Sequence, residues 1–493
     1  MRESGIKPDK SQEDVSLWLA FMPLLLLFVL LGTNVALYGD DSLSGANQIA
    51  LILATAFASA LSVFSGGRWQ QVQEQIVENI KAAGPAILIL LMVGALVGSW
   101  LVGGVVPTLI YYGLQIFSPS FFIVSCCLLS AIAAIVTGSS WSTSATLGVA
   151  LMGIGYTLGF NPGLVAGAII SGAYFGDKMS PLSDTTNLAS GVCGVELFTH
   201  IRYLSLTSLP SIGISLLAYL VLGWFLGSDG AADNSAELTQ QALAQNINIH
   251  PILLCVPVLV IVFIVRRVPA LPAMFCGVLL GLGSAVVFQQ ALLAQLSTEF
   301  GSSYQVLMQA LYGSLNLETG NAVLDELLSS GGMGGMLNTI WLIVSAMAFG
   351  GAMEATGFLP RITRLLLRRV NSTGALVSAS AGTCLLTNVS ASDQYLSIVV
   401  PGRMFSRAYQ QRGLAPQNLS RTLEDSGTVS SVLVPWNTCG AYHAGVLGVA
   451  TLSYAPWAFF CLISPILTVA FAWLEFKIQY QTDEAPVADS SAG

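Results

Sequence analysis

The sequence predicts an all-α polytopic membrane protein. Of its 493 residues, 54% are hydrophobic and only 9% are charged, whereas soluble domains carry about 25% charged residues. The mean hydropathy is +0.73. Apolar runs recur that can cross the hydrocarbon core, which takes about 17 to 25 residues. They cover residues 17–38, 49–64 with its flanks, 204–226, 271–288, 340–358 and 457–473.

The composition excludes several classes of partner and chemistry. The net charge of −8 comes mostly from loops and tails, so it indicates no particular partner and no nucleic acid binding. The eight cysteines show no CxxC or Cys/His spacing, so no transition-metal site is expected. We expect no cofactor and no enzymatic activity, and the lipid bilayer as the surroundings.

Basic residues next to membrane spans are held on the cytoplasmic side, which orients the chain. They gather in groups separated by long stretches without Lys or Arg. The groups are 2–10, 68–81, Arg202, Arg266 with Arg267, 361–369 and 403–421. Placing all of these groups on the cytoplasmic side predicts about five membrane crossings before an acidic outside segment and five after it. Both termini are then cytoplasmic.

An odd number of crossings in each half makes the halves inverted relative to each other. We predict a first repeat over 1–226, an extracytoplasmic linker over 227–250, a second repeat over 251–475 and a cytoplasmic tail over 476–493.

Polar stretches interrupt two apolar segments in each half. The first half has a re-entrant hairpin at about 121–160, broken at "TGSSWSTSATLG", and a broken span at about 163–200, interrupted at "GDKMSPLSDTTN". The second has a hairpin at about 374–400, broken at "TNVSASDQ", and a broken span at about 420–450 containing "EDSGTVSSVLVPWNTC". Irregular backbone at membrane depth is tolerated only inside protein or along a cavity. Paired interruptions in inverted halves indicate a transporter's binding site; the alternative is close helix packing at small residues.

Charged side chains in these breaks are the candidates for chemistry, because each costs about 2.5 to 3.5 kcal/mol at the bilayer centre. Hard oxygen donors surround them, which suit a small alkali cation such as Na+. Glu424 is a further charged candidate. The predicted cation and proton site comprises Asp184, Asp177, Asn187, Thr185, Ser180, Ser139, Thr143, Asn388, Ser390, Asp393, Asp425 and Asn437.

A buried carboxylate holds either a proton or a metal ion, which is the core of cation/proton exchange. Asp184 is the predicted exchanging carboxylate, because Lys178 is expected to neutralise Asp177 as an internal ion pair. The alternative for that pair is a purely structural role. His443 is a candidate proton relay near neutral pH, with a hydrogen-bonded structural histidine as the alternative.

The run from Gly138 to Tyr203 resembles the NhaC family of bacterial Na+/H+ antiporters. The resemblance is carried by "GSSWSTSATLGVALMGIGYTLG", "GAIISGAYFGDKMSPLSDTTNLAS" and "THIRY". It implies Na+/H+ exchange across a bacterial inner membrane, with Li+ as a further candidate ion. It also implies a scaffold, a moving transport domain with two re-entrant hairpins, and a homodimer.

Three other functions are alternatives. The same family includes members that couple Na+ and H+ movement to malate and lactate exchange; such a carrier needs cationic or amide groups, and the core offers chiefly Lys178. The stretch "YFGD" is similar to the Gly-x-Gly-Asp motif of intramembrane aspartyl proteases. Position 174 is Tyr rather than Gly, so the protease is disfavoured, as is a channel.

Overall fold

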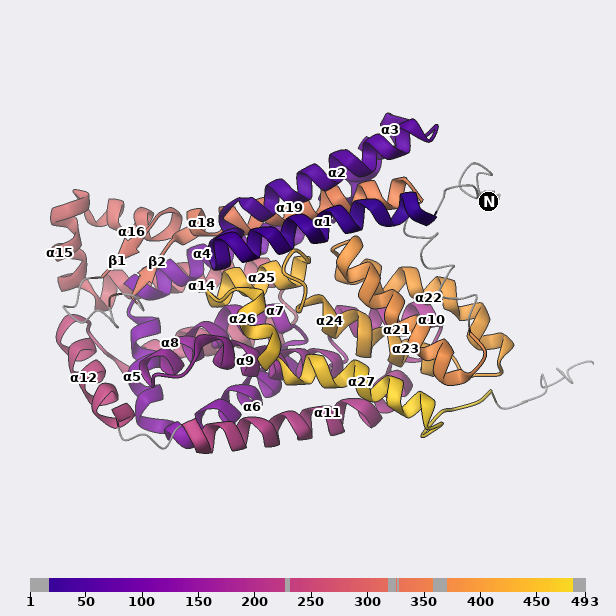
Figure 1. Ribbon diagram of the computed structural model, residues 1–493. Coiled ribbons are helices and arrows are strands. Elements are labelled where there is room, and N and C mark those ends of the chain that lie inside the picture. Colours follow the sequence, from indigo (N-terminus) through magenta and orange to yellow (C-terminus); the bar gives the residue numbers. More distant parts are fainter. Residues whose placement is uncertain (1–16, 227–230, 318–324, 326–327, 358–369, 482–493) are drawn as a thin grey trace, which may run out of the picture.

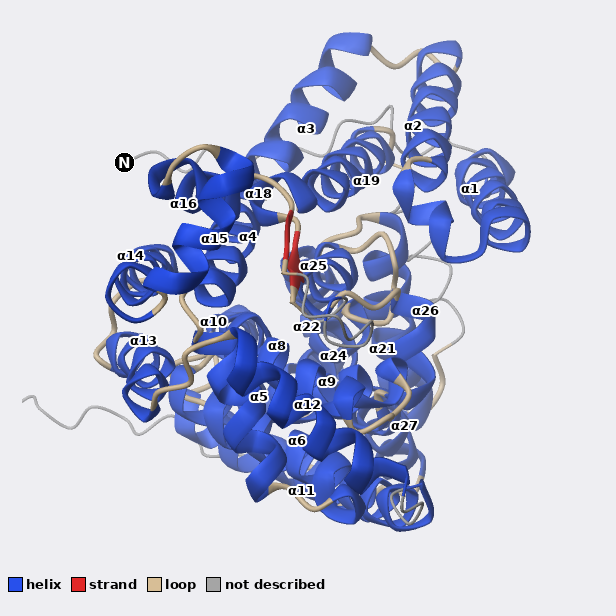
Figure 2. Cartoon of the chain, turned by 90° about the vertical axis from the view of Figure 1, so that its left-hand side faces the viewer, coloured by secondary structure: helices blue, strands red, loops and turns tan. Residues whose placement is uncertain are grey.

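The computed structural model describes residues 17–226, 231–317, 325, 328–357 and 370–481. The regular structure of the described chain is helical, apart from an isolated bridge between Leu414 and Tyr480 and one antiparallel ribbon. In the ribbon, β1 (Leu315–Asn316) pairs with β2 (Ser329–Ser330), drawn in red in Figure 2. Seven helices are long and apolar enough to cross a membrane, or up to nine if each bent pair counts as one span. The predicted all-α polytopic class is confirmed.

The helices of the first half follow one another closely. They are α1 (Leu17–Tyr38), η2 (Gly39–Ser44), α2 (Ala46–Phe64), α3 (Trp69–Ala82), α4 (Gly84–Val102), α5 (Val105–Ile116), α6 (Pro119–Thr137), α7 (Ser140–Thr143), η3 (Ser144–Gly148), α8 (Val149–Thr157), α9 (Pro162–Met179), α10 (Asp184–Cys193), α11 (Leu197–Leu226) and α12 (Ala231–Asn246).

The second half continues the helical pattern. Its helices are η4 (Pro251–Leu254), α13 (Cys255–Val265), α14 (Ala270–Phe288), α15 (Gln290–Phe300), α16 (Ser303–Tyr312), α18 (Gly332–Gly335), α19 (Leu337–Ala355), α21 (Thr373–Ser390), α22 (Gln394–Gln411), α23 (Gln417–Leu423), η5 (Glu424–Thr428), α24 (Val429–Ser431), α25 (Thr438–Leu447), α26 (Thr451–Tyr454), η6 (Ala455–Trp457) and α27 (Phe459–Trp473).

Figure 1 shows where helices gather in the bundle. α1, α2, α3 and α19 lie together at the top, the long α11 and α27 run along the bottom, and α10, α21, α22 and α23 gather on the right. One large apolar core, with Leu90, Phe122 and Tyr442 among its residues, joins elements from both halves. A smaller core, around Phe405 and Leu419, lies where α21, α22 and α23 meet.

Segments α6 to α8 form a helical hairpin whose ends meet. The rings of Phe122 and Phe160 stack with centroids 5.6 Å apart, and Gly138 makes the turn with φ of +69°. α9 then packs closely on α6, because a Cβ at Gly172 would lie 2.0 Å from the Cys127 carbonyl oxygen. The chain of α9 stops at Met179 and resumes as α10 at Asp184.

In the second half, α21 and α22 form the corresponding hairpin. Tyr409 donates to Ser380 Oγ at 3.2 Å, Arg412 donates to the Val370 carbonyl at 3.1 Å, and Ser392 turns the chain with φ of +60°. The segment α23–η5–α24 is separated from α25 by residues 432–437. Helices therefore break at each of the four interruptions read from the sequence. The inverted relation of the halves remains a prediction.

Two segments with predicted sides of the membrane are partly described, and their sides remain predictions. Part of the predicted linker 227–250 is the helix α12, which packs on α5 and α8 with Leu243 fully buried. Arg421, in the group predicted to be cytoplasmic, lies on α23 and is 0% exposed. Residues 1–16, the basic group 361–369 and the tail from 482 lie outside the described residues.

Candidate ion-binding site

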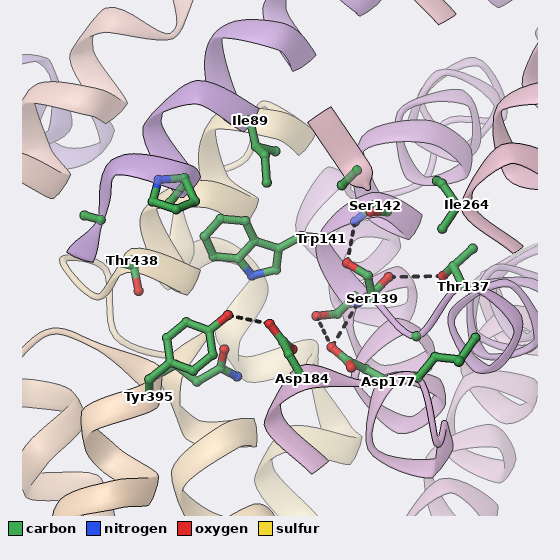
Figure 3. Close-up of a pocket in the computed structure, with 18 of the residues that line it drawn as sticks. Ile89, Thr137, Ser139, Trp141, Ser142, Asp177, Asp184, Ile264, Tyr395 and Thr438 are labelled. Carbon is green, nitrogen blue, oxygen red and sulfur yellow. Dashed lines mark hydrogen bonds between the residues drawn. The ribbon is translucent and has the colours of Figure 1, made fainter. Parts of the chain in front are cut away.

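One open pocket of about 830 Å³ brings the four helix breaks together (Figure 3). Its polar wall comes from the tips of both hairpins and from both broken spans: Thr137, Gly138, Ser139, Ser140, Trp141, Ser142, Asp177, Pro181, Leu182, Asp184, Asp393, Gln394, Tyr395 and Thr438. The rest of the lining comes from residues around the start of α4 and the end of α13, with Arg267 as its basic residue. Segments more than two hundred residues apart thus share one cavity.

A side chain caps the helix that follows each break. Ser139 accepts from Ser142 N at 3.2 Å, and Ser183 accepts from Thr186 N at 3.4 Å. In the second half, Asp393 and Asn437 accept from Leu396 N at 2.9 Å and Cys439 N at 3.0 Å. Such caps satisfy amide hydrogens that a helix start leaves free. Helix starts carry partial positive charge, and the carbonyl ends of the preceding helices carry partial negative charge.

Asp177 is 4% exposed and is held by one residue of the first hairpin. Its Oδ2 accepts from the backbone N of Ser140 at 3.0 Å and from the Ser140 hydroxyl at 2.7 Å. Its Oδ1 has no hydrogen-bond partner among the described residues. One carboxylate oxygen beside the pocket is therefore available for a ligand.

Asp184 faces the same pocket from the start of α10 and is exposed in it. Its Oδ2 accepts from the Tyr395 hydroxyl at 2.5 Å, and its Oδ1 accepts from the Thr185 amide at 2.9 Å. Figure 3 shows Asp184 and Tyr395 pointing toward each other across the cavity. The charge of Asp184 acts on Asp177, so the two carboxylates form one electrostatic unit.

Five other predicted site residues hydrogen bond within the break segments instead of lining the pocket. Each bonds to backbone or to a hydroxyl a few positions away. The geometry therefore gives them a role in shaping the breaks. They are Ser180, Thr185, Asn187, Thr143 and Ser390.

Asn388 and Asn437 join the second hairpin to the second broken span. Asn437 Nδ2 donates to Asn388 Oδ1 at 3.0 Å, and Asn388 Nδ2 donates to the Gly427 carbonyl at 2.7 Å. His443 is also buried, with Nδ1 2.9 Å from the Cys439 carbonyl oxygen. None of these three side chains lines the pocket.

Lys178 pairs with Asp425, so the expected partner Asp177 is wrong. Lys178 Nζ lies 2.6 Å from Asp425 Oδ1, and both side chains are fully buried. Asp177 instead accepts hydrogen bonds from Ser140 through Oδ2. The pair links the two broken spans, 247 residues apart.

Three hydroxyls complete the surroundings of Asp425. Its Oδ1 accepts from Ser464 at 2.9 Å, and its Oδ2 accepts from Thr207 at 2.7 Å and from Thr468. Sequence reasoning missed these hydroxyls as well as Ser140 and Tyr395. A signal for one existed, because hydroxyls recur at 207, 211 and 215 along the apolar span of α11, on one helix face.

The sequence of the whole chain decides the family. A sequence model of the Na+/H+ antiporter family matches residues 172–476. The chain belongs to the Na+/H+ antiporter family. The NhaC resemblance is confirmed by a 38% identity over 426 residues to the Na+/H+ antiporter NhaC of Alkalihalophilus pseudofirmus, covering 86% of this chain and 89% of that protein.

Relatives in this antiporter family carry other names at similar identity. The malate-2H+/Na+-lactate antiporter of Bacillus subtilis is 35% identical over 442 residues, covering 90% of this chain and 92% of that protein. The arginine/ornithine antiporter ArcD of Halobacterium salinarum is 35% identical over 476 residues, covering 96% and 95%.

We predict that Lys178→Met lowers the free energy of unfolding by about 3–5 kcal/mol, because it leaves the Asp425 charge buried without its cation. Thermal unfolding of the purified protein in detergent measures the change. The matched control is Lys81→Met, which removes an exposed pair with Glu78 and is expected to leave the melting temperature unchanged. Equal melting temperatures for Lys178→Met and wild type would contradict the role of the pair.

Proposed function

We propose that this chain exchanges Na+ for H+ across a bacterial inner membrane by alternating access, as a secondary active transporter and not as an enzyme. The observation that carries the proposal is the meeting of four helix breaks at one pocket with Asp177, Asp184 and Asp393 on its wall. Membership of the Na+/H+ antiporter family supports the choice of ions. Li+ as a second ion and a homodimeric assembly belong to the proposal through the family resemblance.

In this account Na+ binds between the carboxylates of Asp177 and Asp184. The free Oδ1 of Asp177, the hydroxyl of Ser139 and the carbonyl ends of the broken helices supply the hard oxygens that an alkali ion needs. Protons compete for the same carboxylates, so loading with one ion releases the other. Binding must stabilise one orientation of the transport domain more than the other for the exchange to be coupled.

The moving body in this proposal consists of the two hairpins and the two broken spans. Their helices are joined by buried hydrogen bonds between Asn437 and Asn388 and between Lys178 and Asp425. The inverted repeats over 1–226 and 251–475, with the two orientations that they imply, remain part of the proposal.

The open side of the pocket is proposed to be the cytoplasmic side. Ala82 and Ala83, which directly follow the basic group 68–81, line the pocket, and so does Arg267. Positive residues beside spans are retained in the cytoplasm. The described conformation then corresponds to the inward-open state.

A second candidate is exchange of an organic ion together with Na+ and H+. The observation that favours it is Arg267 on the wall of the same pocket, in a cavity much larger than a bare Na+ needs. A guanidinium there can bind a carboxylate in bidentate geometry. Relatives named for malate, lactate, arginine and ornithine indicate which organic ions to test.

Purified protein in proteoliposomes with an internal pH dye separates the two candidates. Na+, Li+ or K+ is first added alone. Each cation is then added with malate and lactate, or with arginine and ornithine, on opposite sides of the vesicle membrane. Na+ alone is expected to move protons. A response that requires one of the organic pairs would replace the simple antiporter by the coupled exchanger.

We predict that Asp177→Asn and Asp184→Asn each reduce Na+-driven proton movement by about tenfold or more, because each removes a charge that the ion requires. The same proteoliposome assay measures the rates. The matched control is Glu196→Gln, at an exposed acid near the start of α11, with an expected wild-type rate. Full exchange by both aspartate variants would exclude these residues as the site.

The cytoplasmic opening predicts the labelling of a single introduced cysteine. Leu182→Cys, placed at a 41% exposed pocket residue, is expected to react with a membrane-impermeant maleimide in inside-out vesicles and to react more slowly with Na+ present. Wild-type vesicles measure the background from native cysteines. Preferential reaction in right-side-out vesicles would reverse the assigned opening.

A further inference from the structure

Glu424 is a buried carboxylate that the proposed pocket site leaves unexplained. Its side chain is 0% exposed, and neither carboxylate oxygen has a hydrogen-bond partner among the described residues. On the same turn, the hydroxyl of Ser426 is unbonded, and the hydroxyl of Thr428 is the one donor that acts on Glu424. Buried polar groups in proteins are nearly always hydrogen bonded, so an acid in this state calls for a cause.

The backbone around Glu424 is specialised and fixed. Residues 424–428 form a π-helical turn, η5, a distortion that occurs frequently at functional sites. Asn388 Nδ2 donates to the Gly427 carbonyl at 2.7 Å, and Gln394 Nε2 donates to the Thr428 carbonyl at 3.1 Å. Because Gln394 lines the pocket, the turn that carries Glu424 is bonded directly to the pocket wall.

Within the part of the chain that the structure describes, no cation is paired with Glu424. The charges that act on it are those of Lys178, Asp177 and Asp425, and Lys178 is already paired with Asp425 at 2.6 Å. Arg421, one turn earlier, lies over the Tyr203 ring at 4.5 Å and forms no ion pair within the described chain.

Two further titratable groups on elements packed against η5 belong to other contacts. His200 on α11 contacts Ser420 through Nδ1 at 2.8 Å, and Asp184 on α10 bonds to Tyr395. A carboxylate buried without a counter-ion is far more costly than the neutral acid. The surroundings of Glu424 therefore suit the protonated side chain.

We propose that Glu424 is a proton-binding site distinct from the pocket carboxylates, and that it gives up its proton when Na+ binds at Asp177. The inference rests on the proposed function. In this proposal Asp177 is ionised before Na+ arrives and the exchanged proton leaves the other pocket carboxylate, so Na+ at Asp177 neutralises the negative charge that opposes ionisation of Glu424. The O–H bond of the acid breaks, the electron pair stays on the carboxylate, and the proton passes to pocket water. More than one proton then leaves for each Na+ bound.

Proton counting on the purified protein tests the site. Na+ is added to detergent-solubilised protein in weakly buffered solution, and the protons released per bound Na+ are measured for wild type and for Glu424→Gln. The variant is expected to bind Na+ and to release one proton fewer per Na+. The matched control Glu196→Gln changes an exposed acid in the same way and is expected to keep the wild-type count.

The outcomes separate the two proposals. Wild-type protein that releases no proton with Na+ overturns the proposed function. Wild-type release that Glu424→Gln leaves unchanged overturns the Glu424 site alone. Loss of Na+ binding by folded Glu424→Gln also overturns it, because the side chain would then be a ligand of the cation.

Infrared difference spectra with and without Na+ provide a second measurement, which does not depend on the folding of Glu424→Gln. The wild type is expected to lose the carbonyl stretch of a protonated carboxylic acid when Na+ is added. Glu424→Asp keeps an acid in a changed position and is expected to shift that band while retaining the proton count. A band that is identical in Glu424→Asp and wild type would contradict the assignment.

Discussion

The buried ion pair between Lys178 and Asp425 is the constraint on which the arrangement of the site depends. Both side chains are completely sequestered, and removing two charges from water costs several kcal/mol for each ion. The short distance and the hydroxyls of Ser464, Thr207 and Thr468 offset that cost. The pair ties the broken span of one half to that of the other, and thereby fixes how the two sets of interruptions face each other.

The polar residues around this pair fall into two groups. Some hydrogen bond to the backbone, and others are available to bind an ion. Capping side chains such as Ser183 and Asn437 accept hydrogen bonds from the backbone amides that the breaks leave free. The free oxygen of Asp177 and the exposed carboxylate of Asp184 face the pocket instead. Glu424 lies in neither group. The complete burial of Glu424 suits a side chain that carries a proton. The open pocket suits an ion that arrives with water.

The sequence could predict the fold class and the four breaks, because apolar length and polar interruption are local properties. It could also name Asp177 and Asp184, which lie in a break. The sequence could not predict which side chains pair across the bundle. The partner of Lys178 depends on which helix faces α9, whereas adjacency along the chain favoured Asp177. The burial of Arg421 could not be foreseen either, since a charge in a loop and a buried charge look alike in a sequence.

The most direct test of the account is the pH dependence of Na+ binding to the purified protein, measured by isothermal titration calorimetry. The central claim is that Na+ and protons compete for the carboxylates at the meeting point of the four breaks. The account predicts that Na+ affinity rises as pH rises, because protons then leave the carboxylates that the ion requires. A Na+ affinity that stays constant across pH, with no proton exchange, would contradict it.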